Sequence, residues 1–277
     1  MILNFLKNIA LRVVSVFLTL TLLSIIVSTF SFIGNLSSDS TPSKKQEIKE
    51  NIKSDIENLA AHFHYWNDNN SRAYSGIVNV NTNDVIKSRI NKKYSNASTW
   101  GEFYKEIIDH DKLKINSVYK LFDEIYRTKV LTRQEFADVI VTFVQNIPYN
   151  LLTSESCAKA YINDKSIKEM IDDGTECDGD VYGGIYTPTE FIDYFKGDCD
   201  TRTIFLYTVL NRYKYDTKIL NSDFYGHSII GVNIPWRGSY KRHLGKRYYT
   251  WETTSVNWQL GDISPSTSNM GLWYVAL

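Results

Sequence analysis

Three residues in the last third of the chain have the types and the order that nucleophilic catalysis needs: Cys199, His227 and Glu252. A thiolate can attack a carbonyl carbon, and an imidazole can take and return the proton. A carboxylate can hold the tautomer of that imidazole and stabilise its protonated form. The sequence therefore predicts a covalent mechanism with Cys199 as nucleophile, His227 as base and Glu252 as the orienting acid.

The local setting of Cys199 matters because a helix is predicted to begin there. Free N–H groups and the positive end of the helix dipole favour an anion, so they lower the pKa of a thiol and can bind an oxyanion. Asp198 is expected to cap this helix and to pair with Arg202 one turn further on. Carboxylates at Asp198 and Asp200 disfavour a thiolate, so its formation depends on how closely His227 approaches.

The elements that must position these residues are one helix and the strands after it. Residues 201–212 are apolar nearly all round, which predicts a buried helix. Residues 217–220, 228–234 and 247–254 are rich in β-formers and are separated by Gly, Pro, Asn and Asp. A buried helix packed on an antiparallel sheet is an α+β arrangement.

Residues 46–130 are predicted to be a mainly helical N-terminal part. Its first helix is inferred from an apolar stripe at steps of three and four: Ile48, Ile52, Ile56, Leu59 and Phe63. Another helix is expected near residues 117–127. His62 and His64 fall within the first helical pattern, where residues two apart do not share a face, so a zinc site there is not expected.

Residues 131–277 are predicted to form the catalytic core. Thr132 followed by Glu135 has the spacing of a capping box and predicts a helix from residue 132 to about 144. Residues 154–189 are expected to be irregular. Their acidic run lacks the spacing of a calcium-binding loop, and we predict neither a metal nor a cofactor.

The three cysteines are Cys157, Cys177 and Cys199. An odd count in an exported chain leaves one thiol over. Cys157 and Cys177 are expected to pair and staple the long loop, leaving Cys199 free for chemistry. The alternative is that all three are small buried apolar residues in a reducing compartment.

The segment Val13–Ile33 contains no charge and is dominated by Val, Leu, Ile and Phe. At about 1.5 Å per residue a helix of this length spans roughly 30 Å, the thickness of a bilayer core. Basic residues precede it, which places residues 1–12 in the cytoplasm and the remainder, beginning with a linker over 34–45, outside. The alternative is a cleaved signal peptide.

The motifs taken together resemble the transglutaminase-like superfamily, and more narrowly the bacterial transglutaminase-like cysteine peptidases. The resemblance covers roughly residues 130–277 and rests on three segments: Gly197-Asp198-Cys199-Asp200-Thr201-Arg202, Phe224-Tyr225-Gly226-His227-Ser228 and Trp251-Glu252-Thr253-Thr254. It implies a papain-like core and acyl transfer through a thioester, either to water or to an amine. The superfamily usually has Asp where this chain has Glu252.

The resemblance also implies a side-chain amide that helps to hold the oxyanion. Gln145 is the candidate, and the alternative is a Gln at a helix end whose amide is satisfied by backbone groups.

The sequence thus predicts a cysteine hydrolase or transamidase anchored in the cytoplasmic membrane, acting outside it on protein or peptide amides. The alternative is a catalytically silent scaffold of the same fold in a complex with a membrane protein, suggested by the two flanking acids and by Glu252. Lys and Arg together number 31 and Asp and Glu together 31, so the composition gives no reason to expect a nucleic-acid partner.

Overall fold

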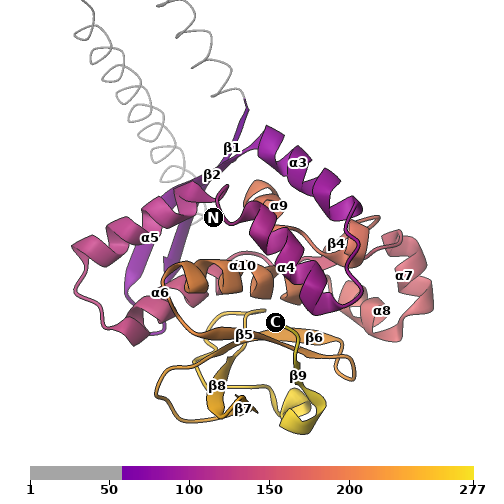
Figure 1. The fold of residues 1–277 in the computed structure, drawn as a ribbon. Coiled ribbons are helices and arrows are strands. Elements are labelled where there is room, and N and C mark those ends of the chain that lie inside the picture. The colour runs from indigo at the N-terminus through magenta and orange to yellow at the C-terminus, as the bar shows by residue number, and fades with distance from the viewer. Residues whose placement is uncertain (1–57) are drawn as a thin grey trace, which may run out of the picture. The chain divides into compact units, whose positions relative to one another are not determined.

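The computed structural model describes residues 58–277, and Figure 1 shows how their elements follow one another. The predicted anchor Val13–Ile33, the linker and the first part of the apolar stripe lie outside the described residues. Between residues 58 and 277, no helix is both long and apolar enough to cross a bilayer.

The described chain begins with a hairpin in which β1 (Leu59–Asn67) pairs antiparallel with β2 (Ala73–Asn81). The helix predicted to run through Leu59 and Phe63 is therefore wrong over these residues. Burial alternates along β1: His64 and Trp66 are buried whereas Phe63 lies on the solvent side. This alternation of buried and exposed residues is that of a strand. It places the indole of Trp66 in the core, where it donates to the carbonyl of Val139 at 3.1 Å.

Four helices follow the hairpin: α3 (Thr82–Lys93), α4 (Trp100–Asp111), α5 (Asn116–Thr128) and α6 (Arg133–Gln145). The helices predicted near 117–127 and from residue 132 are confirmed as α5 and α6. The capping box is also confirmed, since Thr132 accepts from the N–H of Glu135 and the carboxylate of Glu135 accepts from Thr132.

The segment predicted to be irregular, 154–189, contains two short helices and the start of a third, so that prediction is wrong in part. They are α7 (Cys157–Asn163), α8 (Lys165–Asp172) and α9 (Pro188–Tyr194). Strong local caps start two of them: Asp164 accepts from two N–H groups of α8, and a second capping box begins α9. The Cys157–Cys177 disulfide is confirmed, next to the parallel two-residue strands β3 (Leu151–Leu152) and β4 (Cys177–Asp178).

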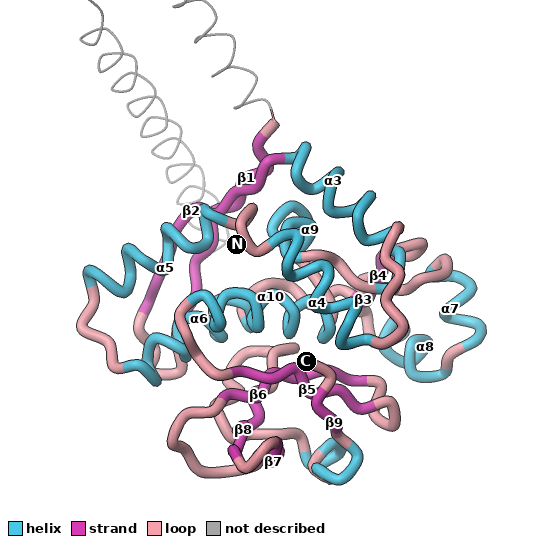
Figure 2. Tube along the Cα trace, viewed as in Figure 1, coloured by secondary structure: helices cyan, strands magenta, loops and turns pink. Residues whose placement is uncertain are grey.

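The centre of the fold is α10 (Cys199–Arg212), which packs on a five-stranded antiparallel sheet of order β7-β8-β6-β5-β9. Figure 2 shows α10 between this sheet and the other helices. The sheet strands are β5 (Thr217–Ser222), β6 (His227–Val232), β7 (Tyr240–His243), β8 (Lys246–Trp251) and β9 (Tyr274–Val275). Three single 3₁₀ turns complete the described elements: Tyr182–Gly184, Pro265–Thr267 and Met270–Leu272. The predicted α+β class and buried helix are confirmed.

Candidate active site

Cys199 is the first residue of α10, at the point where the helix meets β6. Gly197 allows the tight approach, because a Cβ there would lie 2.7 Å from Cγ2 of Thr201. The predicted cap is confirmed: the carboxylate of Asp198 accepts from the N–H of Thr201 at 3.0 Å. Cys199 is 7% exposed, and its thiol donates to Oδ2 of Asp200 at 3.9 Å.

Arg202 is fully buried and does not form the ion pair predicted with Asp198. Its guanidinium donates instead to four backbone carbonyls within the described chain, those of Gly197 at 2.9 Å, Val144 at 2.8 Å, Thr253 at 3.0 Å and Ile147 at 2.6 Å. Burial lowers the pKa of Arg202 to about 10, so the side chain stays charged at neutral pH. It joins the start of α10 to the end of α6 and to the chain after β8.

His227 and Glu252 come together because β6 and β8 are neighbours in the sheet. His227 opens β6, Glu252 directly follows β8, and the imidazole Nε2 lies 2.8 Å from Oε2 of Glu252. The other carboxylate oxygen accepts from the N–H of Thr253 at 2.8 Å and from the N–H and hydroxyl of Thr254 at 3.1 and 2.8 Å. The longer side chain of a Glu thus still bonds the imidazole through Nε2, and Nδ1 forms no hydrogen bond within residues 58–277.

The electrostatics of the pair favour its ionised form. Burial opposes ionisation of Glu252, but the bond and charge of His227 and the donors of Thr254 outweigh it and hold the pKa of the carboxyl at about 2. Burial likewise disfavours the imidazolium, yet the bond to Glu252 and its charge raise the pKa of His227 above 6.5.

The thiol has the opposite surroundings. Burial first, and then the charges of Asp200 and Asp198, raise the pKa of Cys199 well above its usual value, although the N–H of Ser228 acts to lower it. Cys199 is therefore a neutral thiol at rest. Burial and the charge of Asp200 also raise the pKa of Asp198, to about 7.

A polar chain that no sequence motif marks holds Asp200. Burial raises the pKa of this carboxyl, and the hydroxyl of Tyr104 donates to its Oδ1 at 2.6 Å. The amide of Asn221 donates to that hydroxyl at 2.8 Å, and the hydroxyl of Ser228 donates to Asn221 at 3.0 Å. Asn221 on β5 and Ser228 on β6 are cross-strand partners. Polar residues at inward-facing positions of two predicted strands were the sequence signal that could have revealed this chain. No sequence signal links Tyr104 on α4 to α10.

Gln145 ends α6 beside the site, with its amide nitrogen donating to the carbonyls of Glu252 at 2.7 Å and Trp258 at 3.0 Å. Its Oε1 is buried and has no hydrogen-bond partner among residues 58–277. In this conformation the amide anchors the loop after β8, and an oxyanion role would require it to give up one of these bonds. That role stays a prediction.

His62 and His64 do share a face, contrary to the helical prediction, because both lie on β1, where residues two apart point to the same side. Their Nε2 atoms bond the carbonyls of Asp193 at 2.8 Å and Phe143 at 3.0 Å. Among the described residues, no group of three or more His, Cys, Asp or Glu side chains is arranged to hold a metal ion.

Comparison with known proteins finds no significant match to this chain, whether among family models, curated proteins or solved structures.

Proposed function

We propose that the chain is a cysteine hydrolase or transamidase that acts on protein or peptide amides, with a papain-like core of the transglutaminase-like type. One observation carries the proposal. His227 bonds Glu252 at 2.8 Å at the start of β6, and β6 packs against α10, whose first residue is Cys199. The proposal brings this imidazole to the thiol as the base, with its tautomer set by the carboxylate.

In the proposed acylation step, neutral His227 takes the proton of Cys199 at Nδ1 while the sulfur attacks the carbonyl carbon of an amide. The tetrahedral intermediate collapses with cleavage of the C–N bond, and the imidazolium returns the proton to the departing amine. A thioester on Cys199 remains. Water or a second amine then attacks it, giving a proton to His227, which protonates the departing sulfur.

The helix start supplies candidate donors for the oxyanion. The first intrahelical bond of α10 runs from the N–H of Arg202 to the carbonyl of Asp198 at 3.1 Å. The N–H of Cys199 precedes that bond and is one of the groups that a helix leaves unpaired at its N-terminus. Loss of one such donor typically slows acyl transfer by about 10²- to 10³-fold.

The same proposal places the domain outside the cytoplasmic membrane, held by an N-terminal anchor over Val13–Ile33. The Cys157–Cys177 disulfide supports this location, because disulfides persist in oxidising compartments. Cys199 is the free cysteine among the described residues.

A silent interaction module is the second candidate, and the burial of Cys199 together with the raised pKa of its thiol favours it. Retention of the bonded His227 and Glu252 favours catalysis.

The test is mass spectrometry of the intact full-length chain after incubation with native envelope extract at about pH 8. Catalysis predicts an adduct on Cys199 that hydroxylamine removes, as it does thioesters. The adduct should be absent from Cys199→Ala and strongly reduced in His227→Gln, with both variants folded by circular dichroism. If the wild type acquires no labile adduct under conditions in which iodoacetamide labels Cys199, the silent module is correct.

A further inference from the structure

The outer edge of β2 carries main-chain groups that pair with nothing in the described chain. Two bonds show which residue pairs of the hairpin are hydrogen-bonded. The N–H of Asp68 donates to the carbonyl of Arg72 at 3.0 Å, and the N–H of Thr82 donates to the carbonyl of Asn58 at 2.7 Å. Because these pairs recur every second residue, the odd-numbered residues of β2 turn their N–H and C=O groups away from β1.

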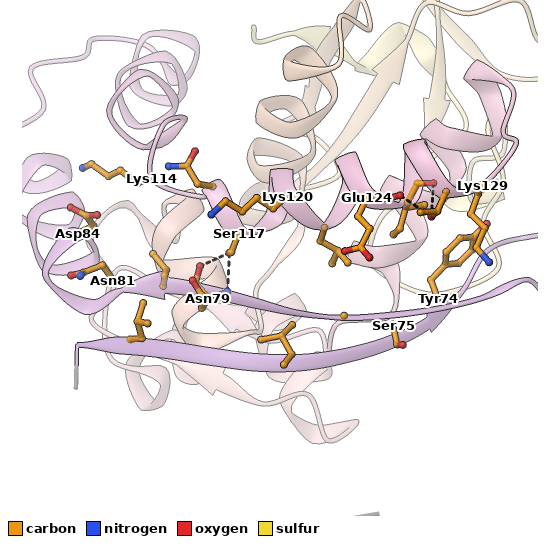
Figure 3. A pocket seen from close by; sticks show the side chains of 18 of the residues that line it. Tyr74, Ser75, Asn79, Asn81, Asp84, Lys114, Ser117, Lys120, Glu124 and Lys129 are labelled. Carbon is orange, nitrogen blue, oxygen red and sulfur yellow. Dashed lines mark hydrogen bonds between the residues drawn. The ribbon is translucent and has the colours of Figure 1, made fainter. Parts of the chain in front are cut away.

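One contact confirms this direction. The N–H of Asn79 donates to the hydroxyl of Ser117 at 2.8 Å, and that hydroxyl donates to the carbonyl of Asn79 at 2.5 Å. A single side chain of α5 thus completes the edge at Asn79, as the dashed lines in Figure 3 show. The outward N–H and C=O groups of Ala73, Ser75 and Ile77 form no hydrogen bond within residues 58–277, so they can pair with another strand.

These groups face a groove between β2 and α5. Its volume is about 680 Å³, and β2 and α5 form its two long walls. Gly76 allows the helix to approach the strand, because a Cβ there would lie 2.3 Å from Cδ1 of Leu121. The outer part of the groove stays open, beside the free edge.

The charges of the helical wall indicate what would fit. Lys120, Glu124 and Lys129 line the groove and form no ion pair within the described chain. Lys114 forms an ion pair with Asp111 at 3.6 Å, and Asp84 on α3 lies 3.9 Å from Lys87. The wall therefore offers two free cations and one free anion to an incoming segment.

We propose that the groove binds an extended, acidic peptide segment of a partner protein, which adds a strand to β2 over Ala73–Ile77. Main-chain bonds to Ser75 and Ile77 hold the segment, and its acidic side chains meet Lys120 and Lys129. The segment spans about five residues, because Ser117 closes the edge at Asn79. The proposal is independent of the chemistry at Cys199.

The experiment measures fluorescence anisotropy of a labelled five-residue peptide of alternating Glu and Val with the full-length chain in detergent. Ser75→Pro removes an outward N–H without touching the ladder to β1, so binding should weaken about tenfold or more. Ala61→Pro is the matched control, since it makes the same change on the outer edge of β1, and binding should stay within about twofold. Equal weakening by both, or no binding by the wild type, overturns the proposal.

Two further variants keep the test informative if Ser75→Pro does not fold by circular dichroism. Joint Lys120→Glu and Lys129→Glu substitution should shift the preference to a peptide of alternating Lys and Val. Ser117→Ala frees the edge at Asn79 and should tighten a seven-residue Glu-Val peptide relative to the five-residue one. An unchanged charge preference overturns the proposal, as does a wild-type dimer, seen by light scattering, that Ser75→Pro dissociates.

Discussion

The two sides of the candidate site are prepared in opposite ways. On the sheet side, His227 and Glu252 carry opposite charges, and each raises the ionised fraction of the other. On the helix side, Asp198, Cys199 and Asp200 are adjacent acids buried together. Burial raises the pKa of all three, and repulsion from neighbouring carboxylates adds to it for Asp198 and Cys199. The general base is assembled in advance, whereas the nucleophile is held as a neutral thiol.

The different protonation of Cys199 and His227 determines how turnover should depend on pH. The reactive form needs one proton shared between Cys199 and His227, so it appears only once the imidazolium has lost its extra proton. Because Glu252 raises the pKa of His227 above 6.5, turnover should rise with pH through that higher value. We expect the rising limb on the alkaline side of pH 6.5.

Arg202 joins the two sides, and its loss should have the largest effect on stability. Arg202→Met removes donors from four carbonyls within the described chain, two at the end of α6, one before α10 and one after β8. A buried acceptor without a partner costs about 1–3 kcal/mol, so we expect a loss of about 4 kcal/mol or more in urea unfolding. Arg212→Met, on the exposed end of the same helix, is the control. Similar losses for the two variants would contradict the joining role.

Local signals made much of the framework predictable. The apolar run of residues 201–212 gave a helix that extends over Cys199–Arg212, and the Thr132–Glu135 spacing marked the start of α6. Strands β6 and β8 were predicted because their β-formers are bounded by turn residues, although β8 ends at Trp251 and Glu252 follows it. The bonded pair of His227 and Glu252 follows from these elements.

Features that depend on distant partners could not be predicted. The hairpin was missed because Leu59 and Phe63 also fit a helical stripe, and only the burial of Trp66 against α6 decides for a strand. Arg202 one turn after Asp198 favoured an ion pair, but four carbonyls from separate segments receive its donors. Tyr104 reaches Asp200 from α4 only after folding.

Glu252→Gln should break the sheet side with the next largest effect. Removing one partner of a buried ion pair typically costs 3–5 kcal/mol, and we expect about 3 kcal/mol because the His227 side chain is 17% exposed. The pKa of Glu252 is lowered to about 2, so its contribution is present above pH 4.5 and is lost as pH falls toward 2. The pKa of His227 is raised, so its contribution is present below pH 6.5 and is lost as pH rises through the folded value.

The difference in unfolding free energy between wild type and Glu252→Gln should therefore be largest between about pH 4.5 and 6.5. Urea unfolding at pH 3, 5.5 and 9 measures it. Glu169→Gln, in an exposed pair with Lys165 at 3.4 Å, should show no such maximum. A pH-independent difference would mean that the ion pair does not stabilise the fold.

Asp200→Asn should have the smallest effect on stability and the clearest effect on the thiol. Asp200, whose Oδ2 lies 3.9 Å from the sulfur, is the charge that raises the pKa of Cys199 most, and its removal also lowers the pKa of Asp198. The amide oxygen can still accept from Tyr104, so the fold should persist. Iodoacetamide should label Cys199 several times faster at pH 7, with the midpoint of the labelling profile moved to lower pH. Asp223→Asn, an acid outside this cluster, is the matched control.

An unmoved midpoint in Asp200→Asn would show that burial alone raises the pKa of the thiol. The helix side would then differ from the sheet side in solvent access rather than in charge. Combining Asp200→Asn with His227→Gln separates the two causes. If charge dominates, the double variant should keep a lowered midpoint relative to His227→Gln alone, because the repulsion from Asp200 acts on the thiolate whether or not the imidazolium is present.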